Sequence, residues 1–369
     1  MIPAAYYQTI YLILVTLMTL VVYAQYQGRN GLREFKHTTT DTLVSVLVLF
    51  MVLFIGFRPM SGRYFGDMAN YANWYLWVGE GNVFHFDWNT ENILFDNLLA
   101  WWGSERLGYT SFFVCIAAIY FGAAYLGIRK LFPNHRLTAY LVFLAAFSTF
   151  SYGTNGIKAG AAASLFILAV GYRENLKVCI PLVLLSWGFH HSMIMVVAGL
   201  VLTLFVKSPK LYFAGWVFCF LMAALHVTAF QQLFSEFTTE QGAGYLRGDR
   251  MSLSEQDVVA DKGGFRIDFI LYSAMPVLVG YYAVFKKKMQ LSKLYKDLLN
   301  LYLCLNGLWM LCMYANFTNR IAYLSWFLYP IVLIYPFLQE QWGKARYKTF
   351  GLVMLGHLGF TLFMNLIYY

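Results

Sequence analysis

The chain has 369 residues, of which 60% are hydrophobic and 12% are charged, and its formal net charge is +9. A soluble globular chain carries about 25% charged residues, so this composition excludes a soluble fold and predicts an all-α, polytopic membrane protein. The basic residues are dispersed between apolar runs, which excludes nucleic acid as a partner.

The apolar runs predict a bundle of about 10–12 transmembrane helices in a single membrane domain, 1–369, because a spanning helix needs about 20 mostly apolar residues. The candidate spans are 6–24, 42–57, 109–128, 136–152, 157–172, 178–190, 191–206, 211–230, 266–285, 297–315, 318–338 and 349–367.

The distribution of Lys and Arg decides how the segment 178–206 is interpreted. It is either one long helix or two short ones that meet at the histidines 190 and 191. Short cytoplasmic loops are enriched in Lys and Arg. Most basic residues fall inside only if the chain turns back at the histidines, so we predict a re-entrant or broken helix pair with an outward tip. Two long loops, 58–108 and 231–265, then lie outside.

The first outer loop opens with charged residues directly after an apolar run. Arg58, Arg63 and Asp67 occur there among aromatic residues, and charged groups at a membrane boundary are costly unless they are paired or used. Asp67 is a candidate general base, or a group that orients a sugar hydroxyl; the alternative is a salt bridge with Arg63. If 63–75 is helical, Tyr71 shares their face and is placed to stack on a sugar ring, although interfacial aromatic belts are common.

Several cations lie near the predicted outer ends of spans, where the orientation rule disfavours them. Arginine's planar fork suits phosphate oxygens, so a ring of such cations is predicted to bind a lipid-linked pyrophosphate. The alternative is that they are snorkelling anchors at the interface. The four residues at span ends are Arg58, Lys158, Arg266 and Arg320, and Arg63 in the first outer loop is a further candidate for binding the substrate.

His190 and His191 occupy the predicted outward tip. A histidine of near-neutral pKa can take a proton from an attacking hydroxyl, which makes these histidines candidates for a catalytic base. Adjacent histidines point in different directions on a helix, so one of the two at most serves a given site. The alternative is a histidine that caps a broken helix. No metal-binding or nucleotide-binding motif is visible, and the five cysteines all lie inside apolar runs.

Four segments, in this order and spread over nearly the whole chain, resemble the EpsG/Wzy-like polymerases of bacterial exopolysaccharide and O-antigen. Lys158 departs from the pattern, because the family usually has arginine there; charge is kept, but bidentate phosphate recognition is lost. The segments are Phe57-Arg58-Pro59 through Phe65-Gly66-Asp67 and Tyr71, Asn155-Gly156-Ile157-Lys158, Phe189-His190-His191-Ser192, and Asn319-Arg320. The third resembles the H-x-S element of the family, which matches His190 rather than His191 and so implies that His190 is the catalytic histidine.

The resemblance implies a membrane-embedded glycosyltransferase of GT-C-like architecture in the bacterial inner membrane, surrounded by membrane lipids. Such an enzyme transfers a glycan from undecaprenyl pyrophosphate to the next lipid-linked repeat unit at the outer face. The lipid-linked oligosaccharide would be its substrate, and a chain-length co-polymerase its partner. No cofactor is required, because cations can stabilise the leaving pyrophosphate.

Two other functions fit parts of the pattern. A flippase for lipid-linked oligosaccharides would carry cations at the midplane and an internal repeat, whereas these cations lie at predicted outer ends and no repeat is apparent. A membrane O-acyltransferase that modifies the polysaccharide would use a histidine, with an acyl donor that usually arrives from the cytoplasm.

Overall fold

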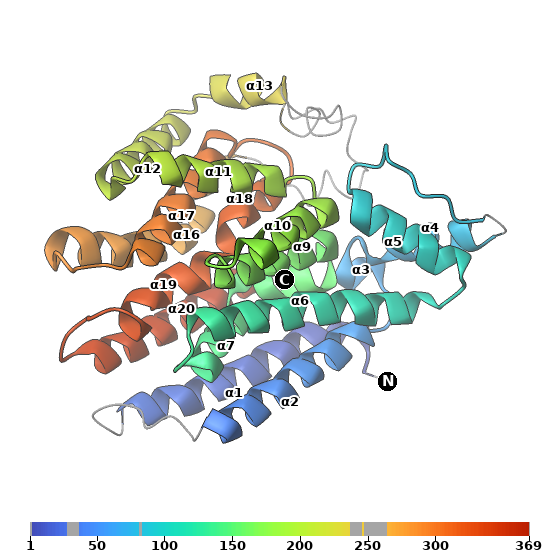
Figure 1. The fold of residues 1–369 in the computed structure, drawn as a ribbon, viewed down its shortest axis with the longest axis horizontal. Helices are drawn as coiled ribbons and strands as arrows, with labels where there is room; N and C mark the ends of the chain where they lie inside the picture. The colour runs from blue at the N-terminus through green and yellow to red at the C-terminus, as the bar shows by residue number, and fades with distance from the viewer. Residues whose placement is uncertain (1, 28–36, 81–82, 237–245, 247–263, 369) are drawn as a thin grey trace. The chain divides into compact units, whose positions relative to one another are not determined.

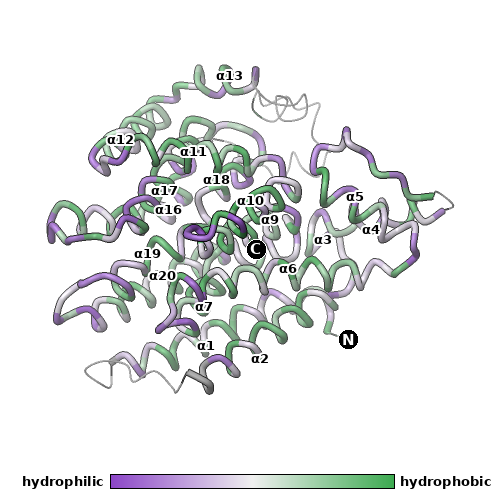
Figure 2. Tube along the Cα trace, in the orientation of Figure 1, coloured by the Kyte–Doolittle hydropathy of each residue, from purple (hydrophilic) through white to green (hydrophobic). Residues whose placement is uncertain are grey.

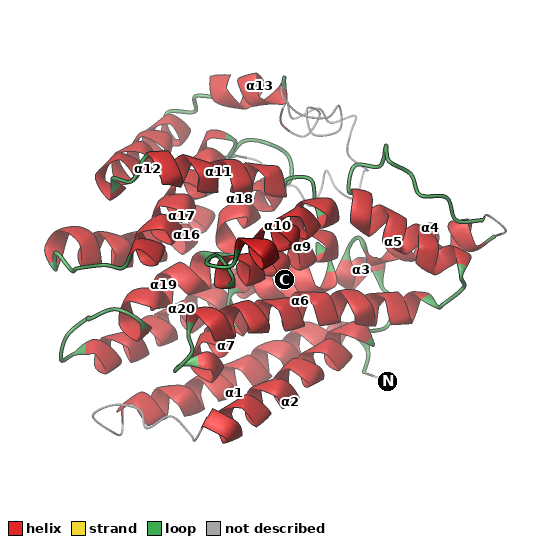
Figure 3. Ribbon diagram, viewed as in Figure 1, coloured by secondary structure: helices red, strands yellow, loops and turns green. Residues whose placement is uncertain are grey.

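The computed structural model describes residues 2–27, 37–80, 83–236, 246 and 264–368. Within these residues every regular element is helical and no strand occurs (Figure 3). The predicted all-α class is confirmed. Most of the predicted outer loop 231–265, including Arg247, Arg250 and Lys262, lies outside the described residues.

The chain packs as two compact units. The first combines Met1–Ile194 with Phe337–Tyr369, and the second is Met195–Pro336. Figure 2 shows that hydrophobic residues follow the helices while hydrophilic residues gather at their ends and turns. That the whole chain acts as one membrane domain stays a prediction.

The first unit is built on two closely packed helices, α6 and α9. Gly127 on α6 permits the contact, because a Cβ there would lie 2.7 Å from the Ile167 backbone of α9, and small residues let transmembrane helices approach. Around this pair lie the other helices of the unit. With that pair included, the helices of the first unit are η1 (Ala4–Tyr6), α1 (Tyr7–Gln27), α2 (His37–Gly56), α3 (Gly62–Phe65), α4 (Met68–Gly79), α5 (Ile93–Ser104), α6 (Tyr109–Leu131), α7 (Arg136–Leu144), α8 (Phe147–Thr154), α9 (Ile157–Gly171), α10 (Leu176–Phe189) and α20 (Arg346–Tyr368).

The first and last helices of the chain are neighbours in this unit. α1 packs along α20 (Figure 1), and Gln8 donates a hydrogen bond of 2.6 Å to the Asn365 side-chain oxygen. Tyr26, at the other end of α1, packs against Phe350 with ring centroids 4.9 Å apart. The C-terminal segment is therefore an integral part of the first unit.

The second unit has an aromatic core in which two buried indole N–H groups are paired. The Trp326 indole donates to Ser273, the Trp309 indole donates to Thr318, and the rings of Trp326 and Phe269 lie edge to face. Buried indole N–H groups usually require such partners. The helices that lie wholly or mostly within this unit are α11 (Met193–Phe205), α12 (Pro209–Ala224), α13 (Ala229–Ser235), α16 (Ile267–Tyr281), the π-helical turn η3 (Tyr282–Lys286), α17 (Lys293–Leu311), α18 (Thr318–Trp326) and α19 (Tyr329–Leu338).

Five helices in the described residues are long and apolar enough to cross a membrane, or up to seven if each bent pair is one span. This number is below the 10–12 expected, because four further apolar helices have only 10–17 residues: Asp41–Gly56, Ile157–Gly171, Leu176–Phe189 and Met193–Phe205. The predicted break at the histidines is present, since α10 ends at Phe189 and α11 begins at Met193.

Two runs expected as single straight spans are instead bent. The run 136–152 is divided into α7 and α8, which meet at 72°, and the run 211–230 into α12 and α13, which meet at 102°. At the second bend His226 has φ +58°, a conformation that cannot continue a right-handed helix. Apolar composition alone does not reveal such a break.

Candidate functional site

Arg58 connects the end of α2 to the end of α8. Its side chain is 3% exposed, and its two terminal nitrogens donate to the carbonyls of Ile55 and Thr154, each at 2.8 Å. The guanidinium also lies 4.9 Å from the ring centroid of Phe113. Burial lowers the pKa of Arg58 to about 9, so the group still carries its charge at neutral pH. This geometry gives Arg58 a bracing role; binding of pyrophosphate by it stays a prediction.

Two of the sequence motifs meet at Gly66 and Asp67. The Asp67 backbone N–H donates to the Asn155 side-chain oxygen at 2.8 Å. Gly66 has φ +51°, and a Cβ on it would overlap the Asn155 amide, so glycine is required there for both conformation and space. Asp67, half-buried at the start of α4, is thus held beside the segment that contains Lys158.

The helical face proposed for Arg63, Asp67 and Tyr71 does not form. α3 ends at Phe65 and α4 begins at Met68, because Gly66 between them has a positive φ that cannot continue a right-handed helix. Arg63 is exposed. Tyr71 is 8% exposed and packs edge-on against Phe95, with ring centroids 5.4 Å apart. Its position is that of a core residue, so stacking of Tyr71 on a sugar would require rearrangement.

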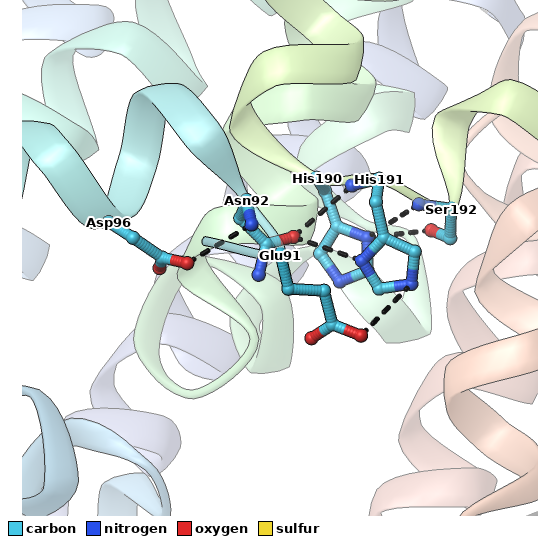
Figure 4. A network of polar contacts seen from close by, with 6 residues as sticks. All are labelled: Glu91, Asn92, Asp96, His190, His191 and Ser192. Atoms are coloured by element: carbon cyan, nitrogen blue, oxygen red, sulfur yellow. Dashed lines mark hydrogen bonds and ion pairs between the residues drawn. The ribbon is translucent and has the colours of Figure 1, made fainter. Parts of the chain in front are cut away.

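A network of polar contacts joins the start of α5 to the break after α10 (Figure 4). The Asn92 side-chain oxygen accepts from the His191 backbone N–H at 3.1 Å and lies 3.2 Å from His191 Nδ1. His191 Nε2 lies 3.6 Å from Glu91 Oε1. Asn92 is 1% exposed, whereas the side chains of His191 and Glu91 are 36% and 33% exposed. The network therefore has a buried anchor and an accessible end.

Asp96 and Lys158 add opposite charges to this network. Asp96 is 8% exposed and accepts from the Asn92 backbone N–H at 3.0 Å. Burial raises the pKa of the Asp96 carboxyl, and the positive charge of Lys158 opposes that shift. Lys158 is half-buried, and its positive charge also lowers the pKa of His191.

His190 faces Ser192, the third residue of its motif. His190 Nδ1 lies 2.7 Å from the Ser192 hydroxyl and accepts from the Ser192 backbone N–H at 3.3 Å. The rings of His190 and His191 stack with centroids 5.1 Å apart. His190 therefore belongs to the same network as His191, as Figure 4 shows.

We refer to the residues of these contacts in the first unit together as the polar cluster. It comprises three groups: Arg58, the pair Asp67 and Asn155, and the residues around Asn92 and the two histidines. Its members are Arg58, Asp67, Glu91, Asn92, Asp96, Asn155, Lys158, His190, His191 and Ser192.

Arg266 and Arg320 belong to the second unit, and each is described there by itself. Arg266 is 8% exposed and makes a bidentate ion pair with Asp268, at 3.1 and 3.0 Å. The ion pair with Asp268 occupies guanidinium N–H groups with which Arg266 would bind a phosphate. Arg320 is exposed, with its guanidinium 4.6 Å from the ring centroid of Phe317. Convergence of these two arginines with the cations of the first unit stays a prediction.

Sequence reasoning did not single out Asn92, Asp96 or Glu91. The available signal was an acid at position 96 within an amphipathic pattern that otherwise predicts a buried helical face; that face is indeed buried at Phe95, Asp96 and Leu99. Within the described part of the chain, no group of three or more His, Cys, Asp or Glu side chains is arranged to hold a metal ion.

The comparisons with known proteins give one match. The model of the EpsG family matches residues 41–368, which include every member of the polar cluster. No curated protein and no solved structure matches the chain. The resemblance drawn from the four sequence segments is confirmed by this match.

Proposed function

This chain belongs to the EpsG family, and from that premise we propose that it polymerises a polysaccharide from lipid-linked repeat units. Family membership implies a membrane role of polysaccharide-polymerase type. The finer proposal is that a glycan is transferred from undecaprenyl pyrophosphate to the next lipid-linked repeat unit, at the outer face of the bacterial inner membrane.

One observation carries the proposal: polar segments far apart in the sequence gather in a unit of apolar helices. Backbone and side-chain contacts tie Arg58 to Thr154, Asp67 to Asn155, and Asn92 to His191. Charged and polar groups in such surroundings are costly and mark functional sites. The cluster contains a cation for a leaving group, carboxylates, and imidazoles that exchange protons near neutral pH.

In the proposed reaction, an acceptor hydroxyl attacks the anomeric carbon of the donor glycan. The new C–O bond forms as the bond from that carbon to the pyrophosphate oxygen breaks, and undecaprenyl pyrophosphate leaves with the bonding electrons. Lys158 stabilises the charge that develops on the pyrophosphate. A base accepts the hydroxyl proton; Asp67 and His190 are the candidates nominated by the sequence.

The test supplies native substrate to the full-length protein in vesicles. Lipid extracted from a host strain that lacks this protein provides the unpolymerised repeat units. We expect a ladder of products on a gel, with one undecaprenyl pyrophosphate released per new glycosidic bond, measured by mass spectrometry. Lys158→Ala should lower turnover by roughly 10²–10³-fold, and Lys158→Arg should restore much of it. The matched control is Lys177→Ala, an exposed lysine outside the cluster.

Other outcomes identify the alternatives. Absence of a ladder under all conditions, with labelled repeat units still crossing the vesicle membrane, would indicate a flippase. Acylated repeat units, together with cytoplasmic labelling of a Ser192→Cys variant in a cysteine-free background, would indicate an O-acyltransferase. Activity should persist in EDTA; activity lost in EDTA and restored by a divalent ion would contradict the metal-free scheme.

A further inference from the structure

Hydrogen bonds fix which nitrogen of His191 carries a proton. The His191 backbone N–H is always a donor, so the Asn92 side-chain atom that it meets at 3.1 Å must be the amide oxygen. His191 Nδ1 lies 3.2 Å from the same oxygen. Only a protonated Nδ1 can donate to an acceptor, so the lone pair of the neutral ring lies on Nε2.

Glu91 lies where a proton on that atom would be stabilised. Its Oε1 is 3.6 Å from His191 Nε2, just beyond ordinary hydrogen-bonding distance. A neutral imidazole beside a carboxylate can accept one proton and become an ion pair, because the negative charge stabilises the imidazolium that forms. Because both side chains are about one-third exposed, a substrate hydroxyl can reach them.

Burial and the charges around His191 together determine its pKa. Burial lowers its pKa; Glu91 and Asp96 oppose that shift, and Lys158 reinforces it. Glu91 lies in the segment that precedes α5, Asp96 lies in α5 and Lys158 lies in α9. The ring of His190 stacks on that of His191. The His191 ring is thus neutral at neutral pH, the state that a base requires.

His190 has the opposite arrangement. Its Nδ1 accepts from the Ser192 backbone N–H at 3.3 Å and lies 2.7 Å from the Ser192 hydroxyl. The backbone group cannot accept, so Nδ1 carries the lone pair and Nε2 of the neutral ring carries the hydrogen. An atom that already holds its proton donates hydrogen bonds and does not act as a base.

We propose that Glu91 and His191 together form the proton acceptor of the transfer reaction, that Asn92 is a positioning residue that fixes the tautomer, and that His190 donates a hydrogen bond to the substrate through Nε2. The proposal rests on the proposed function. As the acceptor hydroxyl attacks the anomeric carbon, its O–H bond breaks and the proton goes to His191 Nε2. The electrons of the broken glycosyl–oxygen bond leave with the pyrophosphate.

The first experiment is a pH profile of polymerisation with the extracted lipid-linked repeat units. Wild-type turnover should fall on the acid side as the Glu91–His191 pair becomes protonated. His191→Gln should lower kcat by roughly 10²–10⁴-fold, change KM little and remove the acid limb. Glu91→Gln should shift that limb to lower pH, because the carboxylate raises the pKa of His191. Asn92→Ala should lower kcat while Asn92→Asp, which keeps an acceptor oxygen, restores part of it.

His190→Gln should raise KM and keep the acid limb. The matched controls are His85→Gln and Glu105→Gln, both exposed side chains of the same outer segment, which should match wild type. If His190→Gln removes the acid limb and His191→Gln retains it, the assignment is overturned. Thermal unfolding midpoints identify any variant that has lost its fold.

A second measurement does not depend on activity. Nitrogen NMR of the full chain, labelled in its histidine rings, should show the proton on Nε2 of His190 and on Nδ1 of His191, with each signal assigned by loss in the Gln variant. The opposite tautomers would overturn the inference whatever the reaction. If the tautomers are as expected but wild type forms no polymer at any pH, it is the proposed function that fails.

Discussion

Arg58 and Arg266 were nominated by one pattern, a cation at the end of an apolar helix, yet the two units hold them in contrasting ways. Arg58 donates to two carbonyls, and among the described residues no carboxylate pairs with it. Arg266 is neutralised by Asp268 in a bidentate pair. A buried charge without a counter-ion contributes a positive potential around it, whereas a paired charge contributes little. The first unit is therefore the better host for an anionic leaving group.

The largest expected effect is that of removing Arg58. Arg58→Ala leaves two carbonyls without their donor, each at a cost of about 1–3 kcal/mol, and removes the packing on Phe113. We expect the free energy of unfolding to fall by about 3 kcal/mol or more, seen as a lower thermal midpoint in detergent followed by tryptophan fluorescence. Arg63→Ala, an exposed control, should stay within about 0.5 kcal/mol. A stable but inactive Arg58→Ala would instead show that Arg58 acts on substrate.

The next effect tests the contact between the two motifs. Gly66→Ala combines an unfavourable φ with a clash against Asn155, and strained backbone costs of order 1–3 kcal/mol. Gly108 also has positive φ, +85°, but an added Cβ there meets nothing within 4 Å. Gly66→Ala should therefore destabilise the protein more than Gly108→Ala and should also lower polymerisation. Equal unfolding midpoints would mean that the Asn155 contact contributes nothing.

A double-mutant cycle on Arg266 and Asp268 examines the second unit. If Arg266 and Asp268 interact mainly with each other, the free energies of unfolding of Arg266→Gln, Asp268→Asn and the double variant should give a coupling energy of about 1–3 kcal/mol. Arg320→Ala, at an exposed position, should leave stability unchanged. Absence of coupling, with a rise in KM for Arg266→Gln alone, would show that Arg266 contacts the substrate and would make the two units alike.

The smallest effect is the pH dependence of Asp96. Burial raises its pKa in the folded state, so the folded protein binds this proton more tightly than the unfolded chain does. The contribution of Asp96 to the free energy of unfolding is therefore greatest at low pH, and it declines as the pH rises through the pKa that Asp96 has in the folded state. Asp96→Asn, which keeps an acceptor for Asn92, should flatten the dependence of the thermal midpoint between about pH 4 and 7. Glu105→Asn serves as the exposed control; an unchanged slope for Asp96→Asn would contradict the assignment.

The sequence predicted the helical membrane class, the break at the histidines, and most helix positions, because apolar runs and breakers are local signals. The H-x-S pattern singled out His190, and the structure shows its Nδ1 2.7 Å from the Ser192 hydroxyl. The family resemblance was found from four short segments.

What the sequence did not reveal depends on tertiary contacts. Hydropathy marks 136–152 and 211–230 as spans, but the bends in them arise from backbone conformation. Asn92 looks like an ordinary loop residue until the chain brings His191 to it, 99 positions later. The tautomers of the two histidines follow from hydrogen-bond partners, and no residue pattern contains that information. Tyr71 was expected to be accessible to a sugar but is buried. Its residue type does not distinguish the two positions, because aromatic residues occur both in cores and at interfaces.

The packing of α20 on α1 has a consequence for biosynthesis. The first unit takes its final helix from residues that follow the entire second unit in the chain. Translation of that intervening stretch takes on the order of ten seconds at typical rates. Until then, the partner surface of α1 must be covered by lipid or by the insertion machinery, so a ribosome that stalls before α20 leaves a nascent chain with every residue of the polar cluster but without the helix that completes its scaffold.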